Sequence, residues 1–184
     1  IVSNGALVKT VDGDTLAARL VPRQLARDLI LLTRPVRQGA ALIFDRSDAG
    51  QYVWERIDWS HPQREWYFER NHIYMTEAPD LEASLDAEPV QVAFTGSVAE
   101  MRALHTHVRA LSCATQLTLT LTEYAARDFS LFDITAEGCS KGAALADWHT
   151  QRHVTATEVM AVGDNLNDIE LLTFAGHPVV IGNA

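Results

Sequence analysis

Apolar side chains recur along the chain at two different spacings. A repeat of three or four positions predicts amphipathic helices, and five stretches show it: residues 22–33, 61–70, 97–111, 140–153 and 166–174. Alternating or continuous short apolar runs predict strands at residues 40–44, 52–57, 90–95, 116–122, 129–134, 158–162 and 178–181. The pattern therefore predicts a mixed α/β protein.

The order of the predicted elements changes near residue 136. From residue 137 onward helix, strand, helix and strand follow each other, and the strands are apolar throughout, which is typical of a parallel sheet covered by helices. The preceding stretch is rich in paired strands and turns. We expect three segments: residues 1–13 as a strand end and linker, residues 14–136 as an inserted α+β domain, and residues 137–184 as a core fragment.

Composition and charge narrow the classes of partner. The 184 residues are 47% hydrophobic and 21% charged, an ordinary globular balance. The net charge of −9 argues against a nucleic-acid partner, because such proteins concentrate positive charge. A small phosphorylated substrate still fits, since one magnesium ion reverses the local field. The oligomeric state stays open.

The cysteines and the apolar runs bear on the compartment. Cys113 and Cys139 are too few for a disulfide framework and lack Cys-x-x-Cys spacing, so a reducing, cytoplasmic compartment is expected. No apolar run is long enough to span a bilayer, so no membrane partner is expected. The chain opens on Ile1-Val2 and stops just after Ile181, and both ends look like cuts through a fold.

The most informative stretch is Gly163-Asp164-Asn165-Leu166-Asn167-Asp168. It links a predicted strand to a predicted helix, where ligands collect in open α/β sheets. Asp164 and Asp168 are four residues apart on one helical face, and two such charges repel unless a cation lies near them. Magnesium takes one or two carboxylates together with water and phosphate, so this loop predicts a Mg²⁺ site, with Asn167 as a donor to an anion. A helix cap and a turn would explain Asp164 and Gly163 alone, but not the whole run.

Lys141 is the second informative residue. It stands in the first turn of the predicted helix, directly after Ser140 as N-cap. A cation there opposes the helix dipole at a cost of about 0.3–1 kcal/mol. An anion held by Lys141 explains that placement, and a solvated lysine is the alternative.

These motifs resemble those of a known family. Ser140-Lys141-Gly142, the run 162–170, Ala175-Gly176 and Gly182-Asn183-Ala184 look like the third and fourth motifs of the haloacid dehalogenase-like (HAD) hydrolases, and more narrowly of their Cof-type sugar phosphatases. The run from Ser3 to Val8 is similar to the segment that precedes that subfamily's cap. The resemblance covers essentially the whole chain. It implies a partial Rossmann-like core of parallel sheet and helices, with an inserted α+β cap domain.

The resemblance also implies roles for single residues. Lys141 matches the lysine that holds the phosphoryl group, and Asn167 matches a phosphate contact. Asp164 matches the direct Mg²⁺ ligand, Asp168 a second acidic residue near the metal, and Asn4 a substrate or hinge position. In that family an aspartate attacks the phosphoryl group and water hydrolyses the aspartyl-phosphate. A magnesium-dependent phosphatase for small phosphorylated metabolites, with sugar phosphates expected, is implied.

The attacking aspartate of the family lies in an Asp-x-Asp-Gly-Thr motif that would precede Ser3, and the 184 residues do not contain it. Asp12-Gly13-Asp14-Thr15 copies the motif superficially, but it lacks a glycine before the threonine and no buried apolar strand precedes it. We therefore expect a fragment without its nucleophile, inactive on its own. A catalytically dead remnant or binding module, a nucleophile supplied by another chain, and a phosphomutase are the alternatives.

Two further groups of side chains invite a function. His149 and His153 lie one helical turn apart without the glutamate of a zinc protease motif, and a solvated helix end explains them. An aromatic cluster in the middle of the chain, with Arg56 and Arg64, predicts either ordinary core or a specificity pocket. Its members are Tyr52, Trp54, Trp59, Trp66, Tyr67 and Phe68.

Overall fold

A computed structural model describes residues 1–182, which form two compact units. Unit 1 combines residues 1–19 with the chain from residue 137 onward, and unit 2 comprises residues 20–136. The inserted domain was expected to begin at residue 14. Strand β2, Thr15–Ala18, instead pairs with β1, Leu7–Lys9, so the division falls after Arg19. Asn183 and Ala184, part of the family motif, lie outside the described residues.

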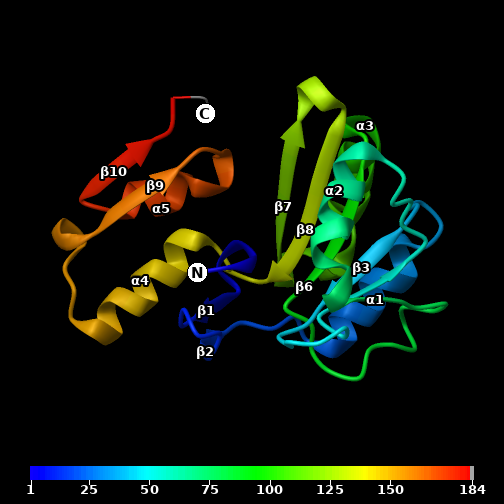
Figure 1. Cartoon of the computed structure of the whole chain (residues 1–184), viewed down its shortest axis with the longest axis horizontal. Helices are drawn as coiled ribbons and strands as arrows, with labels where there is room; N and C mark the ends of the chain where they lie inside the picture. Colours follow the sequence, from blue (N-terminus) through cyan, green and yellow to red (C-terminus); the bar gives the residue numbers. More distant parts are fainter. Residues whose placement is uncertain (183–184) are drawn as a thin grey trace. The chain divides into compact units, whose positions relative to one another are not determined.

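Unit 2 is built on a six-stranded sheet in the order β5-β4-β3-β6-β8-β7, whose long β7–β8 hairpin is prominent in Figure 1. Neighbouring strands run antiparallel, except that β4 and β5 are parallel. The strands are β3 (Ala40–Ile43), β4 (Tyr52–Glu55), β5 (Met75–Glu77), β6 (Gln91–Gly96), β7 (Leu117–Tyr124) and β8 (Phe129–Ala136).

Helices cover both faces of this sheet. Successive strand residues point to opposite faces, and the main core cluster takes Leu42, Phe94 and Phe132 from one face together with Leu29 of α1 (Arg23–Thr33) and Leu104 of α3 (Val98–Arg109). The second cluster takes Ala41 and Trp54 from the other face, where Phe68 of α2 (Pro62–Asn71) packs. Helix α3 begins with a capping box that Ser97 and Glu100 form.

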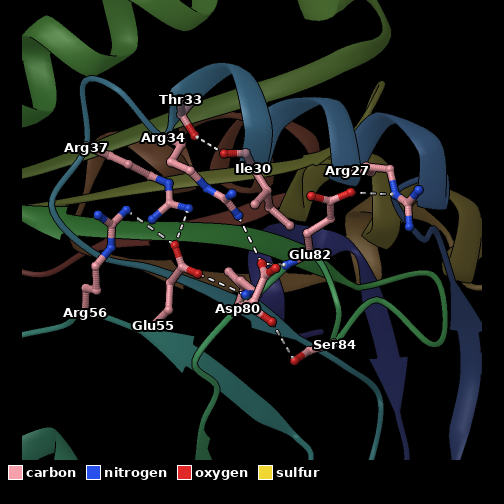
Figure 2. A network of polar contacts seen from close by, with 11 residues as sticks. Arg27, Ile30, Thr33, Arg34, Arg37, Glu55, Arg56, Asp80, Glu82 and Ser84 are labelled. Atoms are coloured by element: carbon pink, nitrogen blue, oxygen red, sulfur yellow. Dashed lines mark hydrogen bonds and ion pairs between the residues drawn. The ribbon is translucent and has the colours of Figure 1, made fainter.

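A buried ion pair fastens the loop that leads from β5 to β6. Arg37 Nη2 lies 2.6 Å from Glu55 Oε1, and both side chains are almost fully buried, at 0% and 5% exposed. The other carboxylate oxygen of Glu55 accepts the amide of Leu81 at 2.9 Å. Figure 2 shows this pair among surface ion pairs of the same region, such as Arg34 with Asp80. Strand β4, the turn after α1 and the loop therefore share one carboxylate.

Up to residue 182, unit 1 contains two small sheets and two α-helices. β1 and β2 form an antiparallel hairpin, and β9 (Met160–Gly163) pairs in parallel with β10 (His177–Val180). The helices are α4 (Lys141–Arg152) and α5 (Ile169–Phe174), and a 3-10 turn, Leu166–Asp168, leads into α5 (Figure 1).

The look-alike of the nucleophile motif lies in the turn of the β1–β2 hairpin. Asp12 and Asp14 are exposed there, and the Asp14 amide donates to Thr10 Oγ1 at 3.0 Å. Leu7 and Val8 of β1 are buried, but the turn that carries Asp12 and Asp14 is the exposed end of the hairpin. Within residues 1–182 no helix has both the length and the apolar character needed to cross a membrane.

Candidate active site

The candidate site begins where β9 ends. At Gly163 an added Cβ would stand 2.6 Å from the Cβ of Asp168, closer than real side chains come, so the loop folds back tightly only with glycine at this position. Asn165 then caps the following turn, because its Oδ1 accepts the amide of Leu166 at 2.7 Å. The Asp168 amide donates to the Asn165 carbonyl at 3.0 Å and closes the turn.

Asp168 is the centre of this loop. Its residue is 4% exposed, and its Oδ1 accepts a hydrogen bond from Lys141 Nζ at 2.5 Å. Its Oδ2 accepts the backbone amides of Asp164 at 3.1 Å and Asn165 at 3.3 Å. Both carboxylate oxygens are thus used to hold the loop and to place the Lys141 ammonium.

The ionisation of Asp168 follows from these contacts. Burial acts to raise the pKa of this carboxyl, but the hydrogen bond from Lys141 and the amides of Asp164 and Asn165 outweigh it. The pKa therefore lies below the ordinary value for aspartate, and the group is a carboxylate at neutral pH. Lys141, whose charge opposes the dipole of α4, is therefore paired with an anionic side chain of the same protein, Asp168.

Lys141 is positioned by the start of α4. Ser140 Oγ accepts the amide of Ala143 at 3.0 Å as the predicted N-cap, and it donates to Glu170 Oε2 of α5. This second contact ties the first turn of α4 to the helix that follows the loop. The side chain of Lys141 is 29% exposed, so its ammonium is within reach of a ligand.

Asn167 connects the loop to the N-terminal segment. Its Nδ2 donates to Asn4 Oδ1 at 3.0 Å, while its own Oδ1 is buried and has no hydrogen-bond partner among residues 1–182. Asn4 has φ of 52° in the 3-10 turn Ser3–Gly5. Gly5, with φ of +92°, lets this turn approach α4, because a Cβ there would lie 2.1 Å from the Ser140 carbonyl oxygen. The two predicted asparagines thus meet.

Comparison with known proteins identifies the family to which the chain belongs. A family model described as haloacid dehalogenase-like hydrolase matches residues 1–184. The chain belongs to this family. The resemblance that the motifs predicted is therefore confirmed.

Individual relatives agree with this family. An HMP-PP phosphatase of Serratia proteamaculans is 28% identical over 191 aligned residues, covering 100% of this chain and 62% of the relative. A haloacid dehalogenase-like hydrolase from Bacteroides thetaiotaomicron has a TM-score of 0.78 at 19% identity, covering 98% of this chain and 64% of that one. A HAD subclass IIB sugar phosphatase has a TM-score of 0.74 at 15% identity, covering 98% and 63%.

The chain thus spans less than two thirds of the length of each of these three proteins. At such low identity the two structural likenesses show a shared fold, and they confirm the predicted α/β class. The activity of the whole protein does not follow from them.

In this HAD-like hydrolase the two aspartates of the loop differ in what they can offer a metal ion. Asp164 is exposed, and its carboxylate accepts no hydrogen bond from residues 1–182. Both oxygens of Asp168 are engaged. No three His, Cys, Asp or Glu side chains gather as a metal site in the described part of the chain. One available carboxylate fits Mg²⁺, which completes its octahedron with water and phosphate.

Two contacts of the site lie beyond what the sequence motifs reveal. The bond of Ser140 to Glu170 spans 30 residues, and the pair of Lys141 with Asp168 spans 27. The lysine's unfavourable place at the helix start was the one local sign that an anion lay nearby. The histidine pair stays at the end of α4, where His153 closes the helix with φ of 57°.

Proposed function

We propose that the chain supplies the phosphate- and magnesium-binding half of a phosphatase site for small phosphorylated metabolites, with sugar phosphates expected. The observation that carries the proposal is the contact of the Lys141 ammonium with the buried carboxylate of Asp168, at 2.5 Å. Asp168 lies in the loop after β9, which also carries the exposed Asp164. An ammonium has three N–H donors, so after Asp168 takes one, others remain for a phosphoryl oxygen. The names of the phosphatase relatives support the same class of substrate.

Each residue of the loop has a distinct part in this proposal. Asp164 would hold Mg²⁺, which when bound neutralises charge that develops on the phosphoryl oxygens. Lys141 binds the phosphoryl group, and Asp168 fixes the lysine rather than binding the metal directly. Asn167 uses one N–H on Asn4 and has a second for phosphate.

The bond-making step needs an aspartate nucleophile. Its carboxylate oxygen would form a bond to phosphorus as the ester oxygen leaves and takes a proton from a general acid, and water would then hydrolyse the aspartyl-phosphate. No Asp-x-Asp-Gly-Thr motif occurs in the 184 residues, and the Asp12–Asp14 turn is an exposed hairpin end. We therefore propose that these residues alone do not hydrolyse phosphate esters.

The test compares two proteins with p-nitrophenyl phosphate and Mg²⁺. The 184-residue chain should release no p-nitrophenol above the buffer rate. A longer protein in which an Asp-x-Asp-Gly-Thr segment precedes Ile1 should release p-nitrophenol. In that protein Asp164→Asn should abolish the activity, and Asp12→Asn should leave it unchanged. Hydrolysis by the pure 184-residue chain that Asp164→Ala abolishes would overturn the proposal.

A binding role without catalysis is the second candidate, favoured by the same lack of a nucleophile motif in these residues. It predicts that the longer protein binds phosphate with Mg²⁺ yet releases no product. A phosphomutase would instead return an isomeric phosphate ester without net release of inorganic phosphate.

We place the protein in a reducing, cytoplasmic compartment, supported by two buried cysteines, Cys113 and Cys139, that form no disulfide.

A further inference from the structure

The two edges of the six-stranded sheet of unit 2 differ in length and in cover. One edge is β5, which has three residues, and its Thr76 Oγ1 donates to the Ala49 carbonyl at 2.6 Å. The other edge is β7, which has eight residues and pairs with β8 in an uninterrupted antiparallel register (Figure 1). Among residues 1–182, β8 is the one strand that pairs with β7. An edge strand presents a row of backbone N–H and C=O groups on its outer side, so β7 offers these groups to a further strand.

Strand β7 lacks the features that usually protect an edge. Proline, lysine and β-bulges keep edge strands from pairing with another chain. Residues 117–122 contain neither residue type, no bulge and no charged side chain. The charge that follows, Glu123, is occupied by Nε and Nη2 of Arg102, each at 2.7 Å. The outer edge of β7 is therefore neutral and open to pairing along residues 117–122.

The leucines of β7 are less well covered than the residues opposite them on β8. Leu119 stands opposite Ile134, and Leu121 stands opposite Phe132. Ile134 and Phe132 are 0% exposed, whereas the two leucines are only partly buried against the same core cluster. A strand added beside β7 would cover them, because cross-strand neighbours on one face lie about 4.5–5.5 Å apart. Burial of apolar area thus favours an added strand.

The sequence of β7 determines which strand fits this edge. The run Thr118-Leu119-Thr120-Leu121-Thr122 reads the same in both directions. Two antiparallel copies with Thr120 on the two-fold axis place leucine opposite leucine and threonine opposite threonine. The leucines then meet on the core face, and the threonine hydroxyls meet on the other face, where such pairs form hydrogen bonds. A two-fold contact needs a self-complementary surface, and this run provides one.

The charges at the end of the strand do not oppose this pairing. In the register centred on Thr120, Glu123 lies opposite Leu117 of the second copy. The two Glu123 side chains are then separated by the length of residues 117–123, about 20 Å at about 3.4 Å per residue. That separation exceeds the Debye length of about 8 Å at physiological ionic strength. Each Glu123 also keeps Arg102 as its counter-charge, so no unpaired like charges meet along the two strands.

We propose that β7 is a dimerisation edge, through which two copies of this chain join their six-stranded sheets into one continuous sheet across a two-fold axis at Thr120. The inference is independent of the phosphoryl chemistry proposed for Lys141 and Asp168. All the groups that carry it belong to unit 2, and strand pairing needs no turnover.

Cysteine cross-linking tests the register. Directly opposite residues of an antiparallel pair have Cα atoms about 4.5–5.5 Å apart, within the range of about 4.4–6.8 Å that a disulfide spans. Thr120→Cys should therefore form a covalent dimer under mild oxidation. Thr118→Cys is the matched control and should give no covalent dimer, because its two copies would lie about 14 Å apart along the strands. The wild-type chain controls for the buried Cys113 and Cys139.

Association in solution tests the edge itself. Sedimentation equilibrium of the 184-residue chain over a range of concentrations should show a reversible species of twice the 20.3 kDa monomer mass. Thr120→Lys brings two like charges together on the axis and should raise the dissociation constant at least about tenfold. An equimolar mixture of Thr120→Lys and Thr120→Asp should associate again. Thr76→Lys, the same change in the opposite edge strand, should leave the dissociation constant unchanged.

Three outcomes would overturn the proposal: a wild-type chain that is monomeric at every concentration, equal cross-linking of Thr118→Cys and Thr120→Cys, or a dimer that Thr120→Lys leaves intact. A dimer that is lost instead with Met160→Lys, at an exposed position of β9, would assign the contact to unit 1 and count equally against β7. Circular dichroism shows whether each variant is folded, and the charge-swapped mixture separates lost pairing from lost folding.

Discussion

At the scale of single residues, Asp164 and Asp168 differ in their surroundings, although the sequence predicts both of them near a Mg²⁺ ion. Asp168 is buried and spends its oxygens on Lys141 and on backbone amides. Asp164 keeps an exposed carboxylate. The spacing of four residues predicts two carboxylates on one face, but burial decides which of them serves the fold and which remains for a ligand.

Asp168→Asn and Asp164→Asn should therefore differ sharply in stability. Asp168→Asn removes the counter-charge of Lys141. We expect unit 1 to lose about 2–3 kcal/mol, less than the roughly 3–5 kcal/mol typical of fully buried pairs, because the Lys141 side chain is 29% exposed. Asp164→Asn should change the free energy of unfolding by less than about 0.5 kcal/mol. Urea denaturation followed by NMR signals of unit 1 makes the comparison. Equal losses for both variants would contradict the division of tasks.

The pH dependence of unit 1 should follow Asp168. Its pKa is lower in the folded chain than in the unfolded one, so its contribution is fully present above the unfolded value. That contribution is lost as the pH falls from the ordinary aspartate range through the folded pKa. The carboxyl ¹³C shift of Asp168 gives the folded pKa directly, and Lys141→Met should raise it. A titration of Asp168 at or above the ordinary value, unaffected by Lys141→Met, would contradict the assignment.

At the scale of elements, Glu55 joins three parts of unit 2. It ends β4, receives Arg37 from the turn after α1 and accepts the amide of Leu81 from the loop before β6. Burial acts to raise the pKa of Glu55, but the Leu81 amide and Arg37 outweigh it and leave the pKa lowered. Nε and Nη1 of Arg37 are buried and unpartnered among residues 1–182, so the guanidinium depends on this one carboxylate.

Glu55→Gln should accordingly cost about 3–5 kcal/mol in the free energy of unfolding of unit 2, because it leaves a buried cation without its counter-charge. The double variant Arg37→Met/Glu55→Gln should recover part of that loss, since the uncompensated charge is then gone. Arg34→Met removes an exposed pair with Asp80 and serves as the control, at about 0–1 kcal/mol. Thermal and urea denaturation of the four proteins test this. A double variant less stable than Glu55→Gln would contradict the argument.

Local chemistry explains which elements the sequence could predict. The helix predicted at residues 97–111 forms as α3, and the capping box at its start joins Ser97 to Glu100 within one turn, so it depends on local sequence alone. Strand β5 escaped prediction because it has only three residues, too few for a period to show. For the aromatic cluster the sequence predicts either core or pocket, because the helical pattern of α2 does not reveal which aromatic rings of that helix face the sheet. Trp54 is buried in the second core cluster with Met75 and Ala93, and Phe68 packs against that cluster while only partly buried.

At the scale of the whole molecule, the two units differ in the size of the apolar side chains that they bury. Unit 2 buries large side chains such as Phe94, Phe132 and Leu29 completely or almost completely. The buried apolar residues of unit 1 are mostly small, among them Ala144, Ala161 and Ala175. Several of its larger side chains are exposed on β9, on β10 and on the 3-10 turn after β9: Met160, Val162, Val180 and Leu166. Burial of apolar area is the main source of stability, so the unit with alanine at its centre has less of it.

Unit 1 should therefore open well before unit 2. In native-state hydrogen exchange, amides of β9 and β10 should exchange at least about tenfold faster than those of β6 and β8, which corresponds to about 1.4 kcal/mol or more in opening free energy. Residues 20–136 produced alone should melt within a few degrees of the later transition of the whole chain, because both core clusters belong to that unit. Val8→Ala should lower only the earlier transition, and Val92→Ala only the later one. A single cooperative melt, with equal protection in the four strands, would show that the two units share their stability despite their separate cores.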